Sequence, residues 1–204
     1  MQRLICTRCG ASIHPDTAKK NNGLCVPCVR GNQLTIEQRR ENRRKEREEE
    51  EAWEASPERK FWISLVDRVY KEPGGFDALP QGEQMFFLIQ ILGGEIRNGG
   101  FDQFFSNSSG KYYDETVAAL KEMGEWAVLE LLEAAKTILF ADAEVPKDRV
   151  ARFNLMPTQS EEHPQHHAAS LRLDELDKKF YADDGYLTHS LERLAAHHGF
   201  YEDV

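Results

Sequence analysis

The chain has no cysteine after residue 28, although it is 204 residues long. Its four cysteines fall into two close pairs that suit a metal, so no thiol remains for a catalytic nucleophile. The sequence also lacks a G-x-S-x-G elbow, a P-loop and a G-x-G-x-x-G turn after a strand, which mark serine hydrolases and nucleotide-binding proteins. We therefore predict a protein that is not an enzyme.

Long hydrophobic runs are missing as well. No apolar stretch approaches the roughly 20 residues that a membrane-spanning helix needs. The first residues, Met-Gln-Arg-Leu-Ile-Cys, contain no apolar core of a signal peptide. We expect a cytoplasmic protein that has no membrane partner. Strict alternation of polar and apolar residues, the pattern of a half-buried strand, is also absent, so the predicted fold class is mainly α.

The cysteines follow the spacing C-x2-C-x15-C-x2-C, with Cys6 and Cys9 in one pair and Cys25 and Cys28 in the other. Each pair can point two thiolates at one ion, and two pairs complete a tetrahedral Zn²⁺ site. Some thirty residues with so little apolar content would not fold without the metal. We predict a four-cysteine module over residues 1–33 that holds a structural Zn²⁺. The segment 10–31 also resembles short bacterial zinc-ribbon modules, which implies metal binding only.

Residues 34–55 form a run of charges that we interpret as a solvated linker helix. Opposite charges stand four residues apart, as in Glu41 with Lys45 and Arg44 with Glu48. The first half of this segment is basic. Contact with nucleic acid therefore stays open as a weaker alternative for residues 1–50.

Charge is divided unevenly along the chain. The net charge is −9, and it splits into +3 for residues 1–52 and −12 for residues 53–204. The larger part should therefore repel nucleic acid and attract basic partners.

Apolar residues recur at spacings of three and four through residues 56–204, which predicts a compact all-helical domain of about six to eight helices. The residues between 142 and 167 contain several prolines, and we expect them to be rich in loops. Histidines at 163–167 and 197–198 could form a second metal site only if they converged. Nothing in their spacing requires this, and we expect them at the surface.

The central helix should stop at Asn98-Gly99-Gly100 and restart at once in a segment rich in phenylalanine. Polar side chains gather at this corner, and we expect them to cap the backbone groups of two helix ends. The alternative is a catalytic cleft lined by Glu95, Asp102 and Gln103. The residues of this structural motif are Glu95, Asn98, Gly99, Gly100, Phe101, Gln103, Phe104, Phe105 and Asn107.

The string N-G-G-F-x-Q-F-F-x-N from Asn98 to Asn107, followed by Ala118-Ala119-Leu120 and Gly124, resembles the bacterial DNA-mimic protein domain family. The resemblance covers roughly residues 60–200 and is sharpest over 86–141. It implies an acidic, all-α and often dimeric protein. Such a protein occupies the DNA-binding surface of a transcriptional regulator by displaying carboxylates as DNA displays phosphates.

Carboxylates one helical turn apart, about 5.4 Å, are spaced on a scale comparable with the charges of DNA. The candidate partner-binding residues are Glu122, Glu125, Glu130 and Glu133 in one row and Asp174, Glu175 and Asp177 in another. The alternative function is that of an adaptor or immunity-type protein. In that case the zinc module docks on protein or nucleic acid, and the acidic domain is a scaffold.

Overall fold

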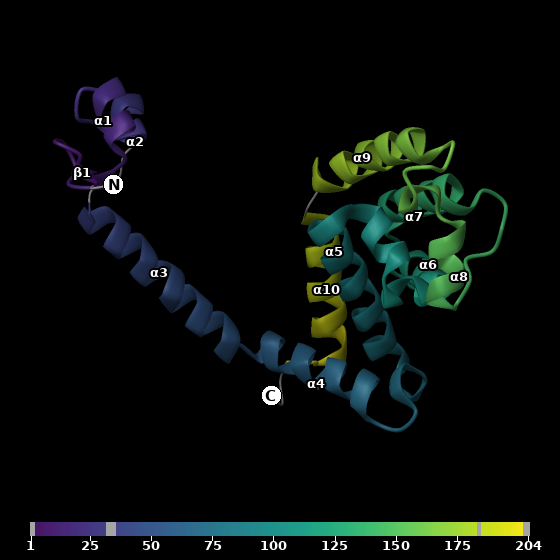
Figure 1. Ribbon diagram of the computed structural model, residues 1–204. Coiled ribbons are helices and arrows are strands. Elements are labelled where there is room, and N and C mark those ends of the chain that lie inside the picture. The colour runs from purple at the N-terminus through teal and green to yellow at the C-terminus, as the bar shows by residue number, and fades with distance from the viewer. Residues whose placement is uncertain (1–2, 32–35, 183–184, 202–204) are drawn as a thin grey trace. The chain divides into compact units, whose positions relative to one another are not determined.

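A computed structural model of the chain describes residues 3–31, 36–182 and 185–201 (Figure 1). The chain divides into two compact units, Met1–Ser56 and Pro57–Val204, so the charged helix is grouped with the cysteine module. Helices dominate the described residues of both units, which confirms the predicted fold class.

The cysteine module contains two short strands and two short helices. Strand β1 (Leu4–Ile5) pairs antiparallel with β2 (Ser12–Ile13), and α1 (Pro15–Lys20) and α2 (Val26–Arg30) follow. Its core is small: it consists of the cysteine side chains with Ile13, Ala18 and a few neighbours. Next comes α3 (Ile36–Ala55), in which Arg44 pairs with both Glu41 and Glu48, as expected for a solvated helix.

The second unit is built around its longest helix. Its elements are α4 (Pro57–Lys71), η1 (Gly75–Ala78), α5 (Gln81–Ser106), η2 (Ser108–Tyr112), α6 (Tyr113–Met123), α7 (Trp126–Phe140), α8 (Arg149–Leu155), η3 (Pro157–Gln159), α9 (His166–Ala182) and α10 (Gly185–His198). Helix α5 contacts each of the other α-helices of this unit, and α10 runs beside it in Figure 1. Helix α5 is therefore the axis of the hydrophobic core. No described helix combines the length and apolar character needed to cross a membrane.

The segment 142–167 is rich in loops, as expected, but it also contains short helical elements that we did not predict. Helix α8 and the turn η3 lie inside this segment. Helix α8 has only seven residues, too few to give a clear periodic pattern, and its buried residue is Arg152 rather than an apolar side chain. Tertiary contacts rather than an amphipathic face stabilise this helix.

Helix α5 breaks at the predicted glycines. Gly99 has φ −159° and ψ 27°, and Gly100 has φ 74° and ψ −175°. The second value pair lies in a region that is essentially restricted to glycine. Beyond the break, Phe101, Phe104 and Phe105 are fully buried. The predicted corner between two buried helical segments is confirmed.

We predict that Gly100→Ala destabilises the protein by about 3 kcal/mol or more. A Cβ at this position would collide with the carboxylate of Asp177, and the backbone would carry a strain of about 1–3 kcal/mol in addition. The matched control is Gly94→Ala on the same helix, where a Cβ meets no atom within 4 Å. Alanine should there be neutral or stabilising, by up to about 1 kcal/mol. Urea unfolding of both variants tests this, and equal stabilities would contradict it.

Candidate metal centre and acidic surface

The four cysteine side chains converge on one point. The Sγ atoms of Cys6 and Cys28 are 3.6 Å apart, and those of Cys9 and Cys25 are 3.8 Å apart. All four sulfur atoms lie within 4.8 Å of one another. Four sulfurs at 2.3 Å from a central Zn²⁺ would be separated by about 3.8 Å in a regular tetrahedron. The cluster therefore has the size of a four-thiolate metal site.

Backbone groups of the module hold the sulfurs in place. The N–H of Cys25 donates to the Sγ of Cys6 at 3.2 Å, and the N–H of Ala11 donates to the Sγ of Cys9 at 3.4 Å. Gly10, with φ 71°, allows the tight turn after the first pair. The guanidinium of Arg8 also ties the two halves together by donating to the carbonyl of Cys28 at 2.8 Å.

Four adjacent thiols need a cation if all are to lose their protons. Burial raises the pKa of Cys28 to about 12, and the neighbouring thiols act in the same direction. At Cys6, burial also acts to raise the pKa, but backbone hydrogen bonds, led by that from Cys25, outweigh it and lower the pKa to about 6. One thiol thus ionises easily while another resists, and a bound metal ion would stabilise all four as thiolates.

At the corner of α5, the polar motif residues bind one another. The carboxylate of Glu95 accepts hydrogen bonds from the side chains of Gln103 at 2.7 Å, Asn107 at 2.9 Å and Ser109 at 2.8 Å. Our expectation that Glu95, Gln103 and Asn107 cap backbone groups with their side chains is therefore wrong. These side chains instead tie the two halves of α5 to the turn η2. Asn98, the remaining member of the set, is exposed.

Helix α9 supplies the caps at the break. The N–H of Phe101, the first donor of the new helical segment, is bonded to Oδ1 of Asp177 at 2.9 Å. One turn further along α9, the hydroxyl of Tyr181 donates to the carbonyl of Ile96 at 2.6 Å. Asp177 and Tyr181 thus satisfy a donor and an acceptor on opposite sides of the break.

The residues of the catalytic alternative, Glu95, Asp102 and Gln103, are also engaged in hydrogen bonds within the fold. Asp102 accepts from the hydroxyl of Thr158 and from the amide of Gln159, the latter at 2.9 Å. Because Glu95 and Gln103 bind each other and Asp102 binds the η3 turn, these groups act as links between elements. This arrangement supports a structural role for the corner.

Arg152 is a structural residue that the sequence pattern did not identify. Its side chain is fully buried on α8 and donates to four backbone carbonyls, those of Phe105 at 2.9 Å, Asn107 at 2.6 Å, and Pro146 and Lys147 at 2.8 Å. Two of these carbonyls lie at the C-terminal end of α5, where a cation is favoured. Burial lowers the pKa of Arg152 from its ordinary value. An arginine within an otherwise unremarkable short segment gives no sequence signal for such a role.

Two carboxylates of the predicted acidic rows, those of Glu125 and Asp177, are bonded inside the fold. Glu125 is only 8% exposed and is bound by the hydroxyl of Ser190 and by Arg193 at 3.4 Å. Asp177 is half-buried as the cap of Phe101, and burial raises its pKa although the N–H of Phe101 acts against this. Both carboxylates are used inside the fold, so assigning them to a partner-binding surface is wrong.

The other five predicted carboxylates remain at the surface. Glu130 and Glu133 are exposed on α7, and Asp174 and Glu175 are exposed on α9, which packs against α7. Glu122 is also exposed, and it accepts from the amide of Gln81. Two adjacent helices therefore keep four of the candidate carboxylates at the surface, and Glu133 lies 3.9 Å from the Nζ of Lys121.

A family model described as DMP19-like protein matches residues 77–198, which is more than half of the chain. The chain belongs to the DMP19-like protein family. This match confirms the resemblance to DNA-mimic proteins. No curated protein and no solved structure matches the chain significantly.

The DMP19-like match begins within η1 and ends at the last residue of α10. It includes the corner of α5, the caps from α9 and Arg152. The cysteine module, α3 and α4 precede the matched segment. The family thus accounts for the helical scaffold, and the four-cysteine cluster lies outside the matched part of the sequence.

We predict that Arg152→Met lowers the free energy of unfolding by about 3 kcal/mol or more. The variant keeps an apolar stem but leaves buried carbonyls without a donor, at about 1–3 kcal/mol for each. Arg149→Met is the control, because exposed Arg149 donates only to the carbonyl of Ser106, at 2.9 Å. It should cost about 1 kcal/mol or less. Thermal unfolding distinguishes the two, and similar losses would refute the role given to Arg152.

Proposed function

We propose that the helical domain is a non-catalytic interaction domain that binds a basic, DNA-binding protein and competes with DNA for it. The observation that carries the proposal is membership of the DMP19-like family. The net charge of −12 over residues 53–204 supports it, because that charge attracts a positively charged surface. We place this interaction in the cytoplasm, where a cysteine cluster stays reduced and free to hold metal.

The exposed carboxylates on α7 and α9 are the proposed contact residues, namely Glu130, Glu133, Asp174 and Glu175. Their helices lie side by side, so a partner can meet charges from both at once. Glu122 lies at the end of α6, and we keep it as a peripheral member of the surface. A partner held in this way should be released by salt. At 0.1 M salt, the attraction between exposed charges is largely screened beyond about 10 Å, and this distance shortens as the salt concentration rises.

A second candidate function rests on the cysteine module. Four of its apolar side chains are between 44% and 62% exposed. They are Leu4, Ile5, Val26 and Val29. In this alternative, the module docks on a protein through that apolar surface and the helical domain is a scaffold. We propose Zn²⁺ as the metal in either case, because four thiolates in a closed tetrahedral site suit it best.

We predict that partners captured from the native cytoplasm on the full-length protein are released as salt rises and are also displaced by added duplex DNA. The variant E130Q/E133Q/D174N/E175Q should lose this capture. A matched control, E58Q/E72Q/E161Q/E192Q, removes the same charge from other exposed positions and should retain it. Equal loss in both variants would show a response to net charge alone. Release by a chelator instead of by salt would favour the adaptor function.

We also predict one zinc ion per purified chain, measured by elemental analysis. Cys9→Ser or a strong chelator should abolish the dispersed amide NMR signals of the cysteine module, because its small core contains the ligands themselves. Signals of residues 57–201 should persist, since that unit has a separate hydrophobic core. Unchanged signals of the module after metal removal would overturn this prediction.

A further inference from the structure

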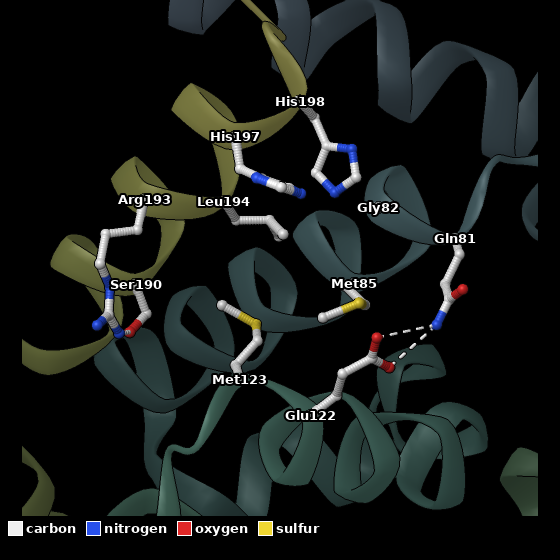
Figure 2. Close-up of a pocket in the computed structure, with 10 residues that line it drawn as sticks. All are labelled: Gln81, Gly82, Met85, Glu122, Met123, Ser190, Arg193, Leu194, His197 and His198. Atoms are coloured by element: carbon white, nitrogen blue, oxygen red, sulfur yellow. Dashed lines mark hydrogen bonds between the residues drawn. The ribbon is translucent and has the colours of Figure 1, made fainter.

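A cavity of about 390 Å³ opens between α5, α6 and α10 in the helical unit (Figure 2). Helix α5 contributes Gly82 and Met85, α6 ends in the cavity wall with Met123, and α10 ends there with His197 and His198. The cavity therefore brings together the ends of three helices. Neither the corner of α5 nor the cysteine module takes part in it.

The ring of His198 is held in a fixed orientation. A Cβ at Gly82 would lie 2.6, 2.7 and 2.9 Å from Nε2, Cε1 and Cδ2 of this imidazole. One face of the ring therefore packs directly on Gly82. Its other neighbour is Phe200, whose ring is stacked at 5.1 Å with an interplanar angle of 11°. Because both faces are covered, the nitrogen-bearing edge is the part of His198 that remains open.

The second imidazole lies close to the first. The rings of His197 and His198 have centroids 4.8 Å apart and are nearly perpendicular. No described residue is hydrogen-bonded to either ring. Both histidines are exposed, as we expected from the sequence, and their side chains line the same cavity at the helix end.

The cavity also receives two thioethers. Figure 2 shows the side chains of Met85 and Met123 across the cavity from the two imidazoles, with Leu194 between His197 and Met123. Met85 is 8% exposed. Methionine often serves as an apolar filler, but a filler side chain normally faces other apolar groups. Here the two sulfurs share their cavity not only with the apolar side chain of Leu194 but also with two imidazoles that have open edges.

The charged groups around the cavity are already engaged. Glu122 is bound by Gln81 at 3.0 and 3.1 Å. Arg193 donates to Ser190 at 2.7 Å and to the buried Glu125 at 3.4 Å. The donors left available are two thioether sulfurs, which are soft and favour Cu(I), and two imidazoles, which also bind copper; this set disfavours hard cations.

We propose that this cavity is a binding site for a soft monovalent metal ion of the Cu(I) class, with Met85, Met123, His197 and His198 as its ligands. The site is separate from the four-cysteine centre and does not depend on the function proposed above. The ligands come from three helices, so the bound ion would link the N-terminal end of α5 to the C-terminal ends of α6 and α10.

Ag(I) is the probe for this site, because it has the charge and softness of Cu(I) and is not oxidised in air. The thiolates of the cysteine module would compete for it, so the experiment uses the full-length chain with all four cysteines replaced by serine. The methyl NMR signals of the methionines report binding. We expect those of Met85 and Met123 to shift on addition of one equivalent of Ag(I). Met156, which is buried elsewhere in the core, should not respond and also reports that the helical unit is folded.

Variants separate the ligands from their surroundings. Met85→Leu and Met123→Leu conserve volume, and each should weaken Ag(I) binding about tenfold or more, as should His197→Gln and His198→Gln. Met156→Leu and His189→Gln, the latter an exposed position on α10, should bind as the parent does. The proposal is overturned if the Met85 and Met123 signals do not shift. It also fails if the leucine variants bind Ag(I) as tightly as the controls.

Discussion

A helix that breaks inside a hydrophobic core must find partners for the backbone groups that the break exposes. In this protein the break at Gly99-Gly100 lies on α5, the axis of the helical unit. Asp177 and Tyr181 of α9 satisfy a donor and an acceptor on its two sides. Arg152 of α8 satisfies two carbonyls at the far end of the same short segment. The positions of α8 and α9 therefore depend on the break as much as on apolar packing.

This constraint changes how the acidity of the domain should be understood. A carboxylate on a predicted helix is not automatically available at the surface. Glu95, Asp102, Glu125 and Asp177 all accept hydrogen bonds that connect separate elements. Glu130, Glu133, Asp174 and Glu175 remain exposed on two adjacent helices. The proposed imitation of DNA therefore involves fewer carboxylates than the net charge indicates, and those carboxylates lie on α7 and α9.

Sequence alone predicted what depends on local pattern. Apolar spacing predicted the helices on either side of the break, the glycines predicted the break itself, and cysteine spacing predicted the convergence of the four cysteines. The missing parts depend on contacts distant in sequence. Phe101 meets Asp177 across 76 residues, and Arg152 meets Phe105 across 47. The convergence of His197 and His198 with two methionines is of the same kind, since it requires the ends of three helices to meet.

The same reasoning explains why the most recognisable stretch of the sequence carries little direct information about a partner. Between Asn98 and Asn107, glycine permits the backbone geometry, phenylalanine fills the core, and Gln103 and Asn107 bind Glu95. All of these residues serve the fold itself, so they would be needed whatever the domain binds. Conversely, a side chain that is exposed on α7 or α9 can change without disturbing the break. The outer faces of α7 and α9, where we propose that a partner binds, can therefore vary while the corner keeps the scaffold constant.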